Sequence, residues 1–465
     1  MPQLLDLPTE IFQHIMAVLV KKHGLPEAWK ARGTSQTFRR YIIYEILANL
    51  SLHDYNSTRV GREILKNYLA DFLFLRSSTL NGFVRHHVPE FIRDVMLALG
   101  PWVTDDEAST SLRKALCELF VRNHRDALRA VTTDINSMGS HLQQTILSTD
   151  IGNQVAAAAA TGSVAALRHF ASAKRHMLWS LSPSFGYPLE VAVYARQTAV
   201  VHAIAQQAIT NQSQEFAESS YTEHLSFRKA ICTAIELGEN DKVGYLLKTY
   251  NDAFGPATEA CMRAWLDTAI VSDDEHALKL LLTIPTQSGL STIYVTFELA
   301  CHLAKPALLH VLFTPHADRT TLSINHIQDN TYPLFTALDS AATPQSVIFV
   351  KELLKLGAGP NGPAYLSGLD RPLRAATRYG NRDVACVALL EAGANPYLVA
   401  GSGWVNSVKR MYGTETETGR AFRKALMECE KPRVAGDEDF LVEVKEEVKD
   451  GQSDGVDEML MYFFF

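Results

Sequence analysis

The sequence predicts an all-α protein in which most of the chain forms a row of paired helices. Apolar residues recur at spacings of three and four along almost its whole length, which is typical of amphipathic helices. Between residues 158 and 376, an alanine in one predicted helix precedes a Val/Leu-rich second helix seven times, at steps of 31 to 42 residues. These frame alanines are Ala158, Ala192, Ala234, Ala269, Ala300, Ala337 and Ala376. One such unit cannot bury its own apolar face, so its neighbours must stack on it.

Composition and cysteine usage narrow the class of protein. The 465 residues are 47% hydrophobic and 20% charged, an ordinary globular composition. No apolar run approaches the roughly 20 residues that span a bilayer, and the N-terminus lacks the basic-then-apolar pattern of a secretory signal. Six scattered cysteines without a C-x-x-C pair indicate free thiols. We therefore expect a cytoplasmic or nuclear protein that does not bind membranes.

The acidic charge is concentrated near the C-terminus. Residues 436–458 contain ten acidic and two basic residues, whereas the whole chain carries a net charge of −7. The rest of the chain is therefore close to neutral and offers no basic field for nucleic acid. We expect residues 436–465 to be an acidic, disordered tail, because so polar a composition cannot offset chain entropy.

Three short helices are expected at the N-terminus. The first runs from Leu7 to Leu19, with Pro8 at a position where its missing N–H costs nothing and an apolar stripe that includes Ile11 and Ile15. Gly24 ends it. A second helix starts near Leu25 and a third covers about 35–46.

This opening resembles an F-box, whose pattern is Leu-Pro-x-Glu-Ile/Leu, a Leu/Trp-centred second helix and a Phe/Trp-Arg pair near the third. The matching residues are Leu7, Pro8, Glu10, Ile11, Ile15, Trp29, Phe38 and Arg39. The chain departs from the pattern at Thr34-Ser35, where a Val-Cys pair is common, and in its spacing around Lys21–Gly24. We assign residues 4–48 to this module. The resemblance implies that Leu7, Pro8, Ile11 and Ile15 dock on a Skp1-like adaptor of a cullin ubiquitin ligase.

The same stripe has a second interpretation. It could pack against residues 60–100 and serve as the N-terminal cap of the repeat array. That interpretation predicts that the chain's own helices cover Ile11 and Ile15, whereas the docking interpretation predicts that part of the stripe is reachable. Residues 49–110 contain further helical spacing without a motif and are expected to be a helical connector, with 101–110 as a polar loop.

The clearest repeat unit lies at residues 369–396. Pro372 begins a short helix that includes Ala376, Gly380 turns the chain, and Gly393 closes a second helix. This stretch resembles an ankyrin repeat, a family whose units recur at about 33 residues. It departs from the pattern at Arg374, where the family has histidine, and by one extra residue between the two glycines. The resemblance implies an array of about seven to eight degenerate ankyrin repeats with a cap over residues 111–430.

No pattern of catalytic residues stands out. The chain lacks the phosphate-binding G-x-x-x-x-G-K-S/T, the G-x-S-x-G elbow and the H-E-x-x-H zinc motif. Adjacent His86 and His87 point apart on a helix, and His302 and His310 have no third ligand in register. Six cysteines cannot supply the eight ligands of a RING zinc pair. We expect no enzyme activity, no metal and no cofactor.

The two resemblances together imply a non-enzymatic adaptor of a Skp1-dependent ubiquitin ligase. Its ankyrin repeats would hold a protein substrate near loop tips such as Asn330, Thr331, Asp370 and Arg371. The alternative is an ankyrin-repeat scaffold for protein interactions that has no link to ubiquitin ligases.

Overall fold

Every regular element in the described part of the chain is a helix, which confirms the all-α prediction for those residues. The computed structural model describes residues 7–78, 87–133, 145–172, 174–211, 219–287, 290–314, 323–325, 332–339, 344–362, 371–376, 382–396 and 417–428. The chain divides into two compact units, Met1–Ala253 and Phe254–Phe465. The division falls inside the stretch expected to be one array. Among the described helices, none combines the length and apolarity that crossing a membrane requires.

The N-terminal helices follow the expected order. Helix α1 spans Thr9–Ala31, but Gly24 inside it has φ 77° and ψ 169°, so two helices meet there at a kink. Helix α2 spans Gln36–Asn49 and begins at Ser35, whose side chain accepts a hydrogen bond from the Phe38 amide. Helix α1 packs along α2.

The described part of the expected connector is mostly helical. It contains α3 (Leu52–Asn56), α4 (Arg59–Asn67), α5 (Leu69–Ser78), α6 (His87–Leu99) and the short 3₁₀ helix η2 (Gly100–Trp102). The buried Arg76 guanidinium donates hydrogen bonds to the carbonyls of Leu47 and Leu50, which ties α5 to the end of α2.

The expected loop at 101–110 is shorter than its polarity suggested. Helix α7 (Asp106–Asn123) already begins at Asp106, because the Asp105 carboxylate accepts a hydrogen bond from the Ala108 amide at 2.7 Å. The polar residues that follow are therefore the first turn of a helix, where acidic side chains complement the helix dipole.

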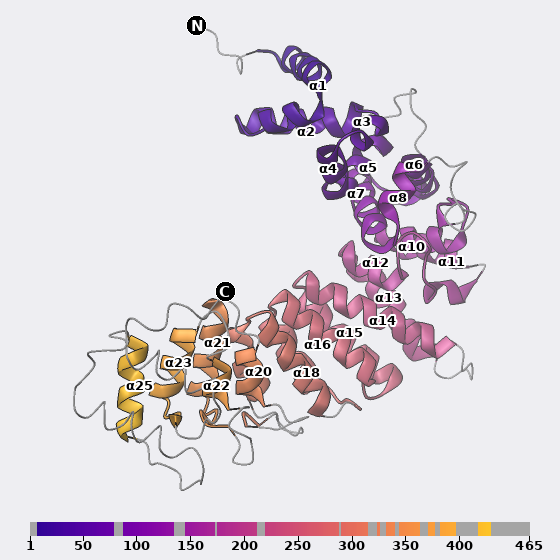
Figure 1. Cartoon of the computed structure of the whole chain (residues 1–465). Helices are drawn as coiled ribbons and strands as arrows, with labels where there is room; N and C mark the ends of the chain where they lie inside the picture. The colour runs from indigo at the N-terminus through magenta and orange to yellow at the C-terminus, as the bar shows by residue number, and fades with distance from the viewer. Residues whose placement is uncertain are drawn as a thin grey trace. The chain divides into compact units, whose positions relative to one another are not determined.

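The remainder of the first unit is built from helix pairs. They are α7 with α8 (Ala127–Thr132), α10 (Ile151–Ala160) with α11 (Val164–Ala171), α12 (Pro188–Tyr194) with α13 (Thr198–Asn211), and α14 (Ser219–Glu236) with α15 (Asn240–Phe254). The 3₁₀ helix η4 (Arg175–Leu178) lies between two pairs. First helices pack on first helices, α10 on α12 and α12 on α14, and α11 packs on α13 (Figure 1).

The second unit repeats this arrangement. Its pairs are α16 (Glu259–Ser272) with α17 (Glu275–Thr283), α18 (Leu290–His302) with η5 (Pro306–Leu308) and α19 (Leu309–Phe313), α20 (Pro333–Asp339) with α21 (Pro344–Lys355), and α22 (Pro372–Ala376) with α23 (Arg382–Glu391). Helix α25 (Glu417–Glu428) packs on α23. The first helices α16, α18, α20 and α22 pack on one another in chain order.

The frame alanines mark where the paired helices turn. All seven are at most 3% exposed. Four residues after a frame alanine the backbone enters the left-handed region in five units, at Gly162, Arg196, Gly238, Asp273 and Ala304. In four of these units the amide after that residue donates to the frame alanine carbonyl, as Lys305 does to Ala300 at 3.0 Å. The spacing found in the sequence therefore coincides with a recurring turn.

Asparagine side chains join consecutive units in the second half. The Asn325 amide group donates to the Gly357 carbonyl at 3.3 Å and accepts from the Gly359 amide at 2.8 Å. Asn361 makes the same two contacts one unit later, to the Gly393 carbonyl at 3.2 Å and from the Asn395 amide at 2.6 Å. Each asparagine thereby satisfies two backbone groups of the next loop.

Candidate functional site

Helix α1 carries apolar side chains that the chain does not cover. Leu7, Pro8, Ile11 and Val18 are exposed, with Ile11 52% accessible, and Ile15 is half-buried. We call these five residues the α1 face. Four of them are the sequence-predicted docking residues: Leu7 and Pro8 lie directly before α1, and Ile11 and Ile15 lie in its first two turns.

A different set of α1 residues supplies the internal packing. Phe12, Met16 and Val20 are buried. The Phe12 ring meets Phe38 and Tyr41 of α2 edge-on, at centroid distances of 5.5 and 5.1 Å. Because these aromatic contacts already hold α1 on α2, the α1 face is not needed for that packing.

Trp29 joins the N-terminal module to the connector. The Trp29 ring packs edge-on against Tyr68 at 5.4 Å, and the Arg32 guanidinium lies 3.9 Å from its centroid. A hollow of about 780 Å³ opens beside the kink of α1, lined by Val18, Leu25 and residues of α2 and α3. The apolar surface near the module therefore extends beyond the α1 face.

The predicted substrate residues do not come together. Asn330, Thr331 and Asp370 lie outside the described residues. Arg371 is only 8% exposed, and its guanidinium donates to the Asn361 carbonyl at 2.8 Å. This side chain is engaged within the chain, in contrast to the projecting loop tip that was expected.

In the first unit, helix α7 lies against the first helices of the following pairs. Arg122 of α7 donates to the Thr233 hydroxyl at 3.1 Å and to the Glu236 carboxylate of α14. Its Nε also lies 3.8 Å from a carboxylate oxygen of Glu190 on α12. About one helical turn earlier in α7, Glu118 accepts a hydrogen bond from the Tyr194 hydroxyl at 3.0 Å. These contacts anchor the C-terminal half of α7.

Glu190 is the buried acid of this cluster. It is 3% exposed, and its carboxylate accepts a hydrogen bond from the Tyr187 amide at 3.4 Å. Burial raises the pKa of the Glu190 carboxyl above its ordinary value, and the nearby Arg122 guanidinium opposes that rise. The cluster is a structural ion pair, since nothing about it places a reactive group in an open cleft.

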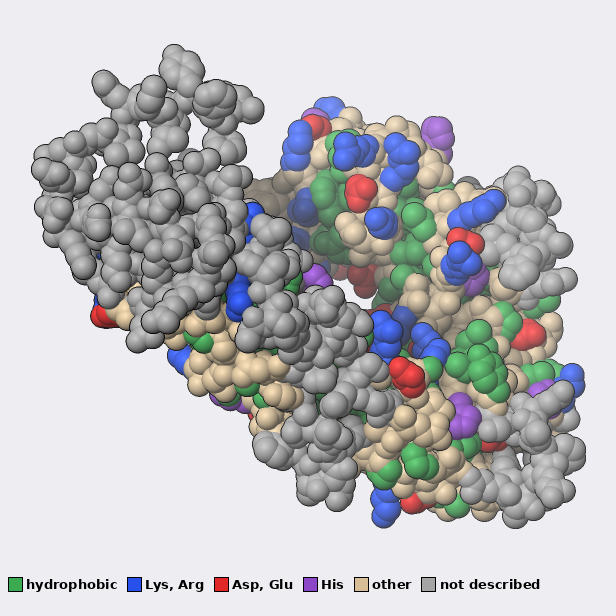
Figure 2. Space-filling model, turned by 60° about the horizontal axis from the view of Figure 1, so that its bottom comes forward, with side chains coloured by type: hydrophobic (Ala, Val, Ile, Leu, Met, Phe, Trp, Pro, Cys, Tyr) green, Lys and Arg blue, Asp and Glu red, His purple; other side chains and the backbone are tan. Residues whose placement is uncertain are grey.

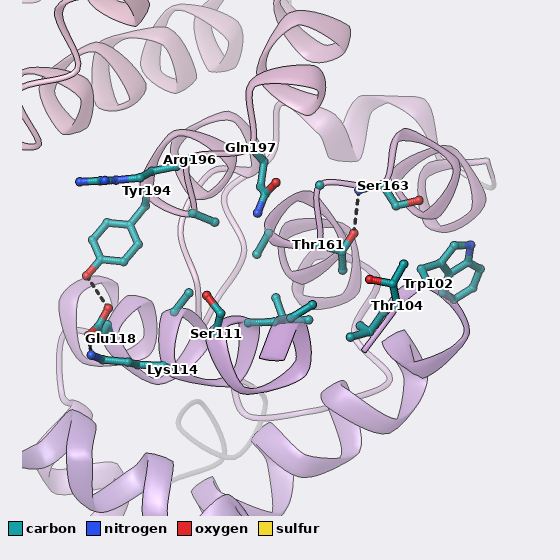
Figure 3. A pocket seen from close by; sticks show the side chains of 17 residues that line it. Trp102, Thr104, Ser111, Lys114, Glu118, Thr161, Ser163, Tyr194, Arg196 and Gln197 are labelled. Atoms are coloured by element: carbon teal, nitrogen blue, oxygen red, sulfur yellow. Dashed lines mark hydrogen bonds and ion pairs between the residues drawn. The ribbon is translucent and has the colours of Figure 1, made fainter. Parts of the chain in front are cut away.

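A groove of about 550 Å³ opens along the other half of α7. Figure 3 shows it between α7, which carries Ser111, Lys114 and Glu118, and the two turns that carry Thr161, Ser163, Tyr194, Arg196 and Gln197. We call it the α7 groove. Trp102 and Thr104 line it from the segment that precedes α7.

The sequence pattern did not identify the α7 groove. It pairs residues near 102–118 with turns near 161 and 196, and no local spacing links these segments. The only available signal was the position four residues after a frame alanine, which places Gly162 and Arg196 at equivalent edges of neighbouring units.

Metal-binding clusters do not suggest another class of site in the described residues. No group of three or more His, Cys, Asp and Glu side chains there could hold a metal ion. On the face drawn in Figure 2, basic and acidic side chains are intermixed with apolar and uncharged ones. Searches found no match among protein-family models, curated proteins or solved structures.

Proposed function

We propose that this protein is a non-enzymatic adaptor of a Skp1-dependent ubiquitin ligase. In this proposal the F-box-like module at 4–48 docks on Skp1 through Leu7, Pro8, Ile11 and Ile15. The helix pairs that follow, proposed to be degenerate ankyrin repeats, bind the protein substrate.

The observation that carries the proposal is the exposure of the α1 face. The rival interpretation of the stripe requires the chain's own helices to cover Ile11 and Ile15, yet Ile11 is 52% exposed. Completing the burial of Ile11, Leu7 and Val18 in an interface would contribute roughly 1 kcal/mol each, since each is already partly covered. Partially exposed large apolar side chains on one helix face suit a protein interface.

The repeat half of the proposal has separate support. The recurring left-handed turn and the asparagine contacts between consecutive units are the features expected of stacked helix–turn–helix repeats. Repeat arrays bind proteins through extended surfaces, which suits a substrate-holding role.

Co-purification with Skp1 tests the docking half. The full-length chain is co-expressed with tagged Skp1, and Ile11→Asp is compared with Ile348→Asp. Ile348 is a matched control because it is an isoleucine of α21 with 51% exposure. We expect wild type and Ile348→Asp to retain Skp1 and Ile11→Asp to lose at least tenfold in affinity, because an interface would bury an unpaired carboxylate.

Two results would overturn the docking half. One is a wild-type chain that does not bind Skp1, and the other is Ile11→Asp binding as tightly as wild type. The first result would leave the alternative, a protein-interaction scaffold without a ligase link, which the same repeat features support.

A further inference from the structure

The α7 groove is left open by the way α7 is anchored. Glu118 and Arg122 hold the C-terminal half of the helix against α12 and α14. The preceding turns of α7, from Ala108 to Ala115, instead form one wall of the groove. Figure 3 shows the turns after α10 and α12 forming the opposite wall. Its volume of about 550 Å³ lies within the range of about 300–1,000 Å³ typical of ligand sites.

Small residues keep the middle of the groove free. Ala108 and Ala115 of α7 line one side of it, and Ala195, which follows α12, lines the other. None of these side chains extends beyond Cβ, so a bound main chain can approach both walls closely.

The groove also presents groups that hydrogen-bond in both directions. The Ser111 hydroxyl can donate and accept, and the Gln197 amide has both functions. The Ser163 hydroxyl accepts a hydrogen bond from the Ala166 amide and can still donate, whereas the Thr161 hydroxyl is already bonded to the Ala158 carbonyl and the Ser163 amide. A peptide backbone alternates N–H donors and C=O acceptors, so such a lining suits an extended chain.

The two ends of the groove differ in chemistry. At one end lies Trp102, whose ring packs 4.9 Å from His169 and 5.2 Å from Phe170 and is thereby held in place. At the other end lie Lys114 and Arg196, with side chains 62% and 67% exposed. Figure 3 shows Trp102 and Arg196 on opposite sides.

Acidic groups near the cationic end are already engaged. Glu118 accepts the Tyr194 hydroxyl bond at 3.0 Å and lies 4.0 Å from Lys114. Glu239 lies 3.1 Å from Arg196 and is also paired with Lys242 at 2.6 Å. Lys114 and Arg196 are therefore largely exposed cations, and the carboxylates paired with them also bind Tyr194 and Lys242. A carboxylate of a bound partner can form charge-assisted hydrogen bonds with both cations.

We propose that the α7 groove binds an extended segment of a protein partner, with an acidic side chain toward Lys114 and Arg196 and an apolar side chain toward Trp102. The inference rests on the proposed function only in identifying this segment as part of the substrate.

Panning a phage-displayed library of random octapeptides on the full-length chain tests the groove. Wild type enriches octapeptides that carry an acidic and an apolar residue at a constant separation. The double charge reversal Lys114→Glu with Arg196→Glu shifts the enrichment from acidic to basic residues. The control reversal, Lys279→Glu with Arg263→Glu, leaves the selection unchanged, because these two cations are similarly exposed and ion-paired but lie in the second unit, outside the groove.

A steric variant provides an independent test. Ser111→Trp fills the groove, whereas Thr110→Trp places the same side chain on its neighbour, which is exposed and does not line the groove. A synthetic octapeptide of the selected consensus binds Thr110→Trp as it binds wild type and binds Ser111→Trp at least tenfold more weakly. Circular dichroism of each variant verifies that it folds.

Failure of the groove and failure of the adaptor proposal give different results. The groove inference is overturned if wild type enriches no octapeptides, or if the charge reversal and Ser111→Trp leave the selection and the affinity unchanged. Skp1 binding of the same variants is measured in parallel and reports only on the α1 face. If the wild-type chain does not bind Skp1 but binds the octapeptide, the adaptor proposal is overturned and the peptide site is supported.

Discussion

The left-handed turn that follows five of the frame alanines in the described residues provides a quantitative test of the repeat frame. At Ala304 the backbone has φ 51°, yet this residue is not glycine. Its conformation is imposed by two hydrogen bonds, from the Ala304 amide to the Cys301 carbonyl at 3.1 Å and from the Lys305 amide to the Ala300 carbonyl at 3.0 Å. Ala304→Gly relieves the conformational strain and keeps both bonds.

The expected gain follows from two opposing effects. A residue with a side chain loses about 1–2 kcal/mol in the left-handed region, and glycine avoids that loss. Glycine also has greater conformational freedom in the unfolded chain, which lowers the free energy of unfolding by about 0.4–1 kcal/mol. We therefore expect Ala304→Gly to raise the free energy of unfolding by about 0.5–1 kcal/mol. The reverse change, Gly238→Ala at φ 67°, should lower it by a similar amount, since the added Cβ meets no atom within 4 Å.

Urea unfolding of the full-length chain, followed by circular dichroism at the helical band, measures these changes as shifts of the midpoint at constant slope. Ala165→Gly is the control, because Ala165 is exposed inside α11 and glycine there should destabilise by about 1 kcal/mol. If Ala304→Gly destabilises the protein as Ala165→Gly does, the turn at Ala304 does not have the assigned conformation.

Three further predictions concern polar contacts between helices and between consecutive units. Replacing Arg122 by Met leaves the buried Glu190 carboxylate without the guanidinium that lies 3.8 Å from it. We expect the free energy of unfolding to fall by about 1–3 kcal/mol, which is less than for a fully buried ion pair because Arg122 is partly exposed. Since burial raises the folded-state pKa of Glu190, the folded protein holds its proton more tightly than the unfolded chain. Stability should therefore fall as pH rises from about 4 through that pKa, and Glu190→Gln should remove this part of the pH dependence of the urea midpoint; an unchanged profile would contradict it. Asn361→Ala removes the hydrogen bonds to Gly393 and Asn395 and should lower the free energy of unfolding by about 1–2 kcal/mol. Hydrogen exchange should become faster at the Asn395 amide and change less at residues of α16. Equal acceleration at both places would contradict a local role of Asn361.

The repeat frame could be found in the sequence because its causes are local. Close packing of a first helix on its neighbours leaves room only for a small residue, so alanine recurs at the contact. The turn lies at a constant distance from that alanine because the hydrogen bonds that close it span only a few residues. Degenerate positions such as Arg196 and Ala304 keep the turn although they lack the glycine that signals it.

Which apolar face of α1 packs inward could not be predicted from the sequence. Leu7, Ile11 and Ile15 stand out by their spacing, but Phe12, Met16 and Val20 form a second apolar face on the same helix. Spacing along one helix cannot tell which face packs inward. The rings of Phe38 and Tyr41, supplied by α2, decide that question.

From the sequence alone, the helical class and the spacing of the frame alanines could be determined, because both depend on residues close together along the chain. The tertiary structure alone decided that Arg122 meets Thr233, 111 residues away, and that Trp102, Lys114 and Arg196 border one groove. Such contacts between residues far apart in the sequence depend on how far each helix is offset along the next helix on which it packs. That offset is set by the summed packing of many side chains, so no single spacing in the sequence records it.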